Sequence, residues 1–418
     1  MQVTWVTEIA SASAALIPHP SRVEIDLDAL TRNVRVLREA VGVAVTAVVK
    51  AGAYGHGAEA VAEAALAGGA SGLAVSTPGE GIALRRAGVD APILVMGWTP
   101  AEIMPEAVAH DLRLAAVEPG DFAAAARAAA DAGRPARLHV KIDSGMGRLG
   151  FPAWDPATPA RILAEARRPG IEIEGIFTHL ACAGQPGDTY TAHQLSLFRQ
   201  VLDELATAGL CPPLVHAANS AGALHWPEAR FNMVRVGIAM YGLGGEPEAV
   251  RALGLEPVLR WVTRVAQVKT LAPGVGISYG RTFVPDRPMR VAVLPVGYAD
   301  GFDRRLSNRG QVLIGGRRVR VLGAVCMDQI IVGEVDESVR RGDEAVLIGR
   351  QGREEVSAAE MAALLDTIPY EVVTRIGPRV VRVYRRGVPG PGDGAGAETT
   401  ARRAGGRRDG WTGPEAGR

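Results

Sequence analysis

The chain has few of the residues and patterns that mark several large classes of protein. Its three cysteines, Cys182, Cys211 and Cys326, are too few and too scattered for a disulfide framework or a zinc site, so we expect a cytoplasmic protein without a metal. No apolar run reaches the roughly 18 residues of a membrane-spanning helix, and the first twenty residues lack the basic segment of a secretory signal. Lys and Arg number 46 against 45 Asp and Glu, which gives no electrostatic case for binding nucleic acid or an anionic membrane.

The rest of the composition is that of an ordinary globular protein, with 47% hydrophobic and 22% charged residues. A length of 418 residues suits two domains, or one barrel plus a smaller module. We expect four segments: an N-terminal extension at 1–20, a barrel at 21–250, a β module at 251–386 and a disordered tail at 387–418. The tail prediction follows from its Gly, Pro and Arg content, which leaves almost no large apolar side chains to bury.

A regular alternation of strand-like and helix-like segments fills the first part of the chain. Apolar runs typical of strands lie at 44–49, 73–76, 92–97, 112–117, 137–142, 172–178, 213–217 and 233–240. Segments of helical spacing lie between them, at 57–67, 79–87, 120–132, 158–167 and 191–208. Eight strands alternating with helices predict an α/β fold, a (β/α)8 TIM barrel. An open doubly wound sheet should show a Gly-rich dinucleotide turn near its first strand, and the sequence has none.

The segments before and after this alternation have different sequence patterns. Residues 22–27 alternate as a short strand, and a helix follows with Asp28 as its expected N-cap. After residue 250, short strands broken by Gly and Pro are predicted at 258–268, 290–294, 311–314, 318–322 and 344–348. One clear helix, at 357–365, begins at a serine cap. These features predict a mostly antiparallel β domain after the barrel.

The expected strand ends carry groups that could hold a cofactor. Lys50 ends the first apolar strand, where desolvation can turn an amine into a nucleophile toward carbonyls. Asn219, Ser220 and the backbone of 237–238 offer the amide, the hydroxyl and the exposed N–H groups that a phosphate requires. A lysine opposite a phosphate site suggests pyridoxal 5′-phosphate (PLP). Arg235, between the two halves of the site, can only donate to an unprotonated pyridine nitrogen, which favours reversible Cα deprotonation over decarboxylation or transamination.

These segments resemble the alanine racemase family over roughly residues 22–385, in the order and spacing of that family. The segment 47–57 (AVVKAGAYGHG) resembles the family's PLP-attachment signature. The resemblance continues through VKIDSGMGRLG at 140–150, FTH at 177–179, ANSA at 218–221, NMVRVG at 232–237, ISYGRTF at 277–283, GYADG at 297–301, VCMD at 325–328 and PYEV at 369–372. The resemblance implies a PLP-dependent enzyme that interconverts L-alanine and D-alanine and supplies D-alanine for peptidoglycan.

The resemblance also implies a role for each matching residue. Lys50 would bind the cofactor covalently and act as the base on one face of the substrate, and Tyr279 would be the opposite base, reaching into the other subunit's site of a homodimer. The remaining implied cofactor contacts are Arg148 at the phenolic oxygen, Arg235 at the pyridine nitrogen, and Tyr54, Ser220, Gly237, Ile238 and Tyr370 around the phosphate. Arg148 and Met327 would bind the substrate, and Lys141, often carbamylated in the family, would hold Arg148 in place.

The implied chemistry agrees with elementary requirements. Inverting a stereocentre needs proton removal on one face and delivery on the other, hence two groups. A tyrosine is a poor base near neutrality unless positive charge stabilises its phenolate. The resemblance implies that His179 and His216 belong to a hydrogen-bond chain from Tyr279 to Arg235, which would supply that charge.

Four positions depart from the family pattern: Gly52, Gly184, Val236 and Ala324 replace an aspartate, an aspartate, a proline and an arginine. The family places the positions of Gly184 and Ala324 on the substrate passage, so we hypothesise relaxed exclusion of amino acids larger than alanine. A racemase of broader specificity is therefore one alternative. A decarboxylase on the same barrel would need an acid at the pyridine nitrogen and a catalytic cysteine, which Arg235 and Tyr279 argue against. A non-enzymatic PLP-binding barrel would lack the β module.

Overall fold

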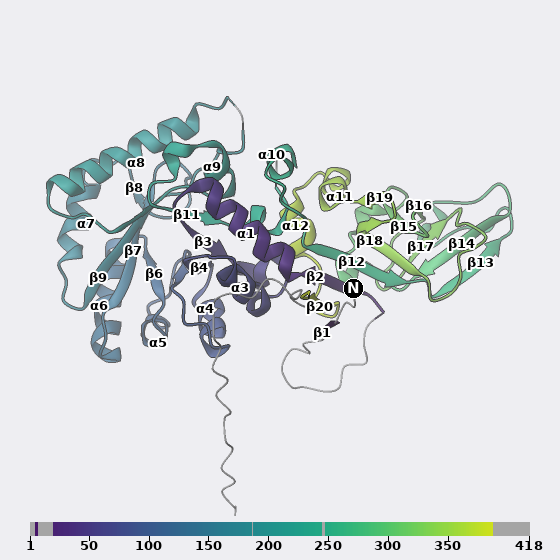
Figure 1. Cartoon of the computed structure of the whole chain (residues 1–418), viewed down its shortest axis with the longest axis horizontal. Helices are drawn as coiled ribbons and strands as arrows, with labels where there is room; N and C mark the ends of the chain where they lie inside the picture. Colours follow the sequence, from purple (N-terminus) through teal and green to yellow (C-terminus); the bar gives the residue numbers. More distant parts are fainter. Residues whose placement is uncertain (1–4, 7–19, 186, 245–246, 388–418) are drawn as a thin grey trace, which may run out of the picture.

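Two sheets lie side by side along the long axis of the molecule (Figure 1), in a computed structural model that describes residues 5–6, 20–185, 187–244 and 247–387. The first sheet is parallel, with the order β10-β9-β7-β6-β5-β4-β3-β11. Its main strands are β3 (Ala44–Val48), β4 (Gly72–Val75), β5 (Ile93–Val95), β6 (Arg113–Ala116), β7 (Ala136–Asp143), β9 (Ile171–Phe177), β10 (Leu214–His216) and β11 (Met233–Val236), and the short β8 (Phe151–Pro152) pairs with β7. The end strands meet where Arg235 N donates to Ala218 O (3.0 Å), which brings the sheet close to a closed barrel. The predicted fold class is confirmed.

Helices surround this sheet as the alternation predicts. They are α1 (Leu27–Val41), α3 (Ala58–Ala67), α4 (Pro78–Arg86), α5 (Met104–Ala109), α6 (Pro119–Ala132), α7 (Thr158–Ala166), α8 (Tyr190–Thr207), α9 (Ser220–His225) and α10 (Pro247–Ala252). Local chemistry sets their starts; Thr77 and Glu80 form a capping box at α4. The expected cap of α1 was wrong by two residues, since Asp26 rather than Asp28 accepts from Ala29 N (2.8 Å). Asp28 lies in the first turn instead, where a negative charge suits the helix dipole.

The second sheet is mostly antiparallel and has the order β1-β20-β2-β12-β18-β15-β16-β17-β14-β13. Its strands are β1 (Trp5–Val6), β2 (Arg22–Asp26), β12 (Leu259–Arg264), β13 (Gln267–Leu271), β14 (Met289–Leu294), β15 (Gln311–Ile314), β16 (Arg317–Leu322), β17 (Ile330–Gly333), β18 (Glu344–Gln351), β19 (Glu354–Val356) and β20 (Val381–Arg385). Two helices accompany them, α11 (Ala358–Leu365), whose predicted serine cap Ser357 accepts from Glu360 N (3.0 Å), and α12 (Pro369–Thr374), which the sequence analysis did not expect.

The chain crosses between the two sheets earlier than the sequence analysis expects. Residues 22–26 fall within the expected barrel segment, yet β2 pairs with β12 and with β20. Alternation identifies a strand but not its partner, and Val23 and Ile25 are buried in either arrangement. These two residues belong to one hydrophobic cluster that contains Phe122 from the barrel and Trp261 from β12 of the second sheet. The two sheets therefore share one core.

The ends of the chain are described only in part. Within the expected N-terminal extension, Trp5 and Val6 pair with Arg385 and Tyr384 of β20. Residues 1–4 and 7–19 and nearly all of the expected tail, from residue 388 onward, lie outside the described residues. Among the described helices, none combines the length and the apolar character that a membrane crossing requires.

Candidate active site

Lys50 lies immediately beyond the first barrel strand, β3. Val49 N donates to Ala74 O (2.9 Å), so sheet hydrogen bonding ends one residue before Lys50. In a (β/α)8 barrel the carboxyl ends of the strands form the face that carries chemistry. Burial and the charge of Arg148 lower the pKa of Lys50. Its amine therefore loses its proton, and becomes a nucleophile and base, closer to neutrality than an ordinary lysine.

A short left-handed turn follows this lysine directly. The segment α2 (Lys50–Tyr54) contains Ala51, Gly52 and Ala53 with φ of 53°, 60° and 55°. Non-glycine residues adopt this conformation at a cost, so contacts around the turn must hold it. One such contact is with Glu80, whose Oε1 accepts from Ala51 N at 2.6 Å. The sequence analysis did not identify this left-handed turn.

Four of the predicted phosphate contacts meet at the end of β11. Ser220 Oγ accepts from Gly237 N (3.0 Å) and Ala239 N (3.4 Å), which fixes the hydroxyl among backbone N–H groups. A Cβ built at Gly237 would lie 2.4 Å from Tyr54 Oη, so only glycine allows this approach. Ile238 follows Gly237 and is buried. The four residues form a small polar cradle of hydroxyls and backbone amides.

The other two predicted phosphate contacts flank this cradle. Tyr370 stands near the start of α12, with its ring centroid 6.0 Å from that of Tyr54. Asn219 is the N-cap of α9, and its Oδ1 accepts from Gly222 N (2.9 Å). Asn219 therefore caps α9 through its side chain, and the Ser220 hydroxyl is left for the cradle.

Arg235 is buried at the centre of a polar network. Its Nη1 donates to His216 Nδ1 (2.6 Å), and its Nη2 donates to Thr178 O (2.8 Å), Ala217 O (3.0 Å) and His179 Nδ1 (3.2 Å). Burial and the charge of Arg235 hold the pKa of both histidines well below the ordinary value, so both rings are neutral acceptors. Among the described residues, every side-chain hydrogen bond of Arg235 uses Nη1 or Nη2. Its Nε–H is the donor left for a ligand.

Four cations gather at this mouth of the barrel. Burial and the charges of Arg148 and Arg235 lower the pKa of Lys141 to about 8, and burial and Arg148 lower the pKa of Arg235 to about 9. Lys50 is coupled to Arg148 in the same way. The carboxylate of Asp143 orders the loop instead, accepting from Arg148 N (2.9 Å) among other backbone groups. Such a concentration of positive charge favours an anionic ligand.

Two predicted site residues, Tyr279 and Met327, lie on loops of the second sheet and not on the barrel. Tyr279 is in the turn η3 (Tyr279–Arg281), within the segment that connects β13 and β14. Its side chain is 73% exposed, and that of Met327 is 53% exposed. Ser278 ties the two loops together, because its hydroxyl hydrogen-bonds with Ala324 O (2.5 Å) and Cys326 Sγ (3.2 Å). The expected link from Tyr279 to His179 is not made inside a single chain.

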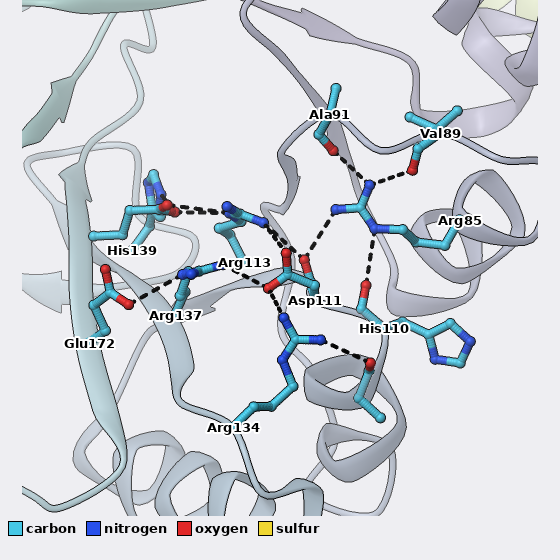
Figure 2. A network of polar contacts seen from close by, with 12 residues as sticks. Arg85, Val89, Ala91, His110, Asp111, Arg113, Arg134, Arg137, His139 and Glu172 are labelled. Carbon is cyan, nitrogen blue, oxygen red and sulfur yellow. Dashed lines mark hydrogen bonds and ion pairs between the residues drawn. The ribbon is translucent and has the colours of Figure 1, made fainter.

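The sequence analysis missed two residues that extend the Arg235 network. His139 Nδ1 lies 2.8 Å from His216 Nε2, and His139 Nε2 lies 3.2 Å from Glu174 Oε2. Figure 2 shows the far side of this group, where Arg113 lies between His139 and Asp111. A signal was present in β7, where polar side chains recur at every second position of an otherwise apolar strand, at 137, 139 and 141.

Models of known protein families were compared with this chain, and two of them match it. A model of the alanine racemase N-terminal domain matches residues 25–245, and a model of the alanine racemase C-terminal domain matches residues 258–384. This chain belongs to the alanine racemase family. The family suggested by the sequence motifs is confirmed.

Individual relatives of the alanine racemase family match nearly the whole chain. The alanine racemase of Symbiobacterium thermophilum is 48% identical over 368 residues, which are 87% of this chain and 97% of that protein. The crystal structure of alanine racemase from D-cycloserine-producing Streptomyces lavendulae matches with a TM-score of 0.85 at 39% identity, over 89% of this chain and 98% of its own. That of Bartonella henselae, which has covalently bound pyridoxal phosphate, matches with a TM-score of 0.78 at 28% identity, over 88% and 100%.

The residues of this chain fit pyridoxal phosphate. The cradle around Gly237 brings together a serine hydroxyl and a tyrosine hydroxyl, which can donate to a phosphate, and the N–H groups of Gly237 and Ala239 fix the oxygen of the serine. The cation cluster suits its negative charge, and Lys50 offers an amine of lowered pKa for its aldehyde. Arg235 Nε–H is the one donor of its guanidinium that the described residues leave for a ring nitrogen.

Proposed function

We propose that this chain interconverts L-alanine and D-alanine with pyridoxal 5′-phosphate, using Lys50 and Tyr279 of the partner subunit as two bases. The observation that carries the proposal is the pairing of a desolvated lysine with a buried arginine at one barrel mouth, in a chain matched by both domain models of the alanine racemase family. We place the reaction in the cytoplasm, where its D-alanine would serve peptidoglycan synthesis.

Lys50 supplies the base on one face of the substrate. When bound, pyridoxal phosphate would make the Cα–H bond of the amino acid acidic by withdrawing electrons through its ring. The lowered pKa of Lys50 lets Nζ accept the Cα proton near neutral pH. Arg235 Nε would donate to the pyridine nitrogen and, as a cation, keep that nitrogen unprotonated. This arrangement favours return of the proton to Cα over other fates of the substrate.

Tyr279 supplies the base on the opposite face, from a second copy of the chain. Its exposed position on a loop of the second sheet supports this assignment, since one chain alone leaves the tyrosine in solvent. Met327, tied to the same turn through Ser278 and Cys326, would arrive with it and contact the substrate carboxylate. In a two-fold symmetric homodimer each barrel would receive the Tyr279 of the partner subunit, which gives two shared sites.

Arg148 and Lys141 complete the site on the side of β7. We assign the Arg148 guanidinium to the phenolic oxygen of the cofactor and to the substrate. Lys141 has a pKa of about 8, so a substantial fraction of its amine is neutral near that pH and can react with carbon dioxide. A carbamate there would replace one of the four cations by a negative charge among the other three, Lys50, Arg148 and Arg235, and hold Arg148 in place.

A racemase of broader specificity is the second candidate. Gly184 and Ala324 are small, and Ala324 adjoins the Tyr279 turn through its carbonyl group. We expect measurable turnover of serine beside alanine. Undetectable racemisation of both serine and valine would restrict the enzyme to alanine.

The direct test is optical. Polarimetry of L-alanine with the purified chain, with and without added pyridoxal phosphate, should show loss of rotation that depends on the cofactor. D-alanine should decay to the same racemic end point. Rotation that stays constant with the cofactor bound would reject the proposed function.

A further inference from the structure

We propose that Glu174 and His139 are positioning residues that couple a remote negative charge to Arg235 through His216. The series runs Arg235–His216–His139–Glu174, with contacts of 2.6, 2.8 and 3.2 Å. The inference rests on the proposed function only in assigning Arg235 to the cofactor. The hydrogen bonds of the series are formed by the side chains alone and do not depend on that function.

The two ends of the series fix every proton within it. Arginine can only donate, so His216 Nδ1 accepts from Arg235 and the proton of the neutral His216 ring is on Nε2. That Nε2–H donates to His139 Nδ1, which leaves the proton of His139 on Nε2. This second N–H donates to the carboxylate of Glu174, which can only accept when ionised. All three bonds therefore point the same way, from the cation to the anion.

The backbone is shaped to make this series. The register of β7 and β9 shifts so that Leu138 pairs with Ile173 and His139 with Gly175, which leaves Glu174 as an extra, bulged residue. Such a bulge redirects a side chain relative to a regular strand. A Cβ built at Gly175 would lie 2.4 Å from His139 Nδ1, so the imidazole occupies the space that any larger residue would need.

The charges agree with this direction. Burial opposes ionisation of Glu174, but the hydrogen bond from His139 and the charge of Arg113 lower the pKa of its carboxyl to about 2. Burial keeps the pKa of His139 below its ordinary value, so the ring stays neutral. Among the described residues no carboxylate forms an ion pair with Arg235 directly. Glu174 is thus the anion that reaches the buried Arg235 cation, through two polarised imidazoles.

The far end of the series is anchored at the opposite face of the barrel. Arg113 Nε donates to Glu174 Oε2 (3.1 Å), and its Nη1 donates to Asp111 Oδ2 (3.0 Å). Arg137 Nη1 also donates to Asp111, at 2.8 Å (Figure 2). This ion-pair network holds the Glu174 carboxylate from behind. The orientation of Arg235 is therefore set from the amino-terminal side of the barrel.

The test combines a variant with a direct view of the histidines. Glu174→Gln keeps an acceptor oxygen and removes the charge, so kcat should fall about ten- to a hundredfold while the KM for alanine changes little. In the chain without cofactor, labelled with ¹⁵N-histidine, His139 and His216 should both be neutral with the proton on Nε2. The Nδ1 resonance of His216 should move in Glu174→Gln, because its bond from Arg235 loses the coupled anion.

The neighbouring Glu172 is the matched control. It lies on the same strand and pairs with Arg137 on the surface (3.2 Å), so Glu172→Gln should leave both kcat and the His216 resonance unchanged. An Nδ1–H proton on either histidine of the wild-type chain would overturn the inference, even if Glu174→Gln did not fold. So would Glu174→Gln with wild-type kcat and an unmoved His216 resonance. A wild-type chain with the expected ¹⁵N signals but no racemisation would instead reject the proposed function.

Discussion

At the residue scale, the site is built from scarce lysines placed among arginines. The sequence contains three lysines, Lys50, Lys141 and Lys269, and two of them belong to the cation cluster. Burial together with Arg148 lowers the pKa of both. Lys269 is exposed on β13, in the other sheet. The surroundings of Lys50 and Lys141 therefore set these two lysines apart from Lys269. Lys269 can serve as a control of the same residue type.

We predict that only Lys50 binds pyridoxal phosphate covalently. Borohydride reduction of the complex, followed by peptide mass spectrometry, should place the label on Lys50. Lys50→Ala should abolish the cofactor's absorbance near the visible edge and lower turnover by at least about a thousandfold, whereas Lys269→Ala should change neither. Label on Lys141, or an absorbance band that survives in Lys50→Ala, would contradict the assignment.

Buried histidines predict how the stability of this protein depends on pH. Burial lowers the pKa of His56, which is fully buried, to about 4, while an unfolded histidine has a pKa of about 6.5. The unfolded state binds more protons between these values, so stability is complete above about pH 6.5 and is lost as the pH falls toward 4. From pH 7 to pH 5, His56 should lower the free energy of unfolding by about 2 kcal/mol.

Urea unfolding at the two pH values measures this effect. His56→Gln keeps a hydrogen-bond donor near the carbonyl groups of Ala53 and Tyr54 but does not titrate, so its unfolding free energy should depend less steeply on pH than that of the wild type. If the unfolding free energies of the two proteins depended on pH in the same way, the buried imidazole of His56 would not be the group whose protonation destabilises the fold, and the prediction would be wrong.

At the element scale, the left-handed turn after β3 carries strain that serves the site. Its glycines differ in what surrounds them. A Cβ at Gly55 (φ 82°) would lie 2.5 Å from Val373 O in α12, the helix that carries Tyr370. A Cβ at Gly52 (φ 60°) would meet nothing within 4 Å. The turn is therefore pressed against α12 at one glycine and free at the other.

These two glycines give a matched pair of variants. Gly52→Ala should cost only the backbone strain, about 1 kcal/mol of unfolding free energy, and leave cofactor affinity unchanged. Gly55→Ala should cost more and displace α12 with Tyr370, so the affinity for pyridoxal phosphate should fall as well. Equilibrium unfolding and cofactor titration measure the two effects. Equal cofactor affinity in both variants would show that α12 does not depend on the turn.

The sequence predicts the elements that are determined by nearby residues, and it does not predict those that depend on contacts between distant segments. The barrel strands and α11 with its Ser357 cap arise from periodicity and capping, and they were predicted within a few residues. The pairing of β2 with β12, the left-handed turn and the bulge at Glu174 depend on partners distant in the sequence. The same limit explains the site: motifs identified Lys50 and Arg235, whereas His139 and Glu174 matter only through contacts that a bulge creates.

At the scale of the whole molecule, one chain presents two incomplete halves of a site. The barrel mouth holds the cation cluster and the cradle, while Tyr279 and Met327 stand exposed on loops of the second sheet. Large apolar side chains are exposed at both places, among them Met146 on the loop after β7 and Val284 and Tyr298 on the second sheet. A symmetric dimer that joins each barrel mouth to the Tyr279 and Met327 loops of the other chain would cover both surfaces at once.

Complementation between two inactive variants tests this arrangement. Each variant expressed alone should be nearly inactive, because each lacks one of the two bases: Lys50→Ala should lose activity by at least about a thousandfold and Tyr279→Phe by about 10²- to 10⁴-fold. When the two are co-expressed, half of the dimers should be mixed, and each mixed dimer should have one intact site, with Lys50 from one chain and Tyr279 from the other. The activity should then recover to about a quarter of the wild-type value, as expected for random pairing in a two-fold dimer. Each variant co-expressed with itself under a second tag is the control, and a mixture no more active than these controls would mean that both bases come from the same chain.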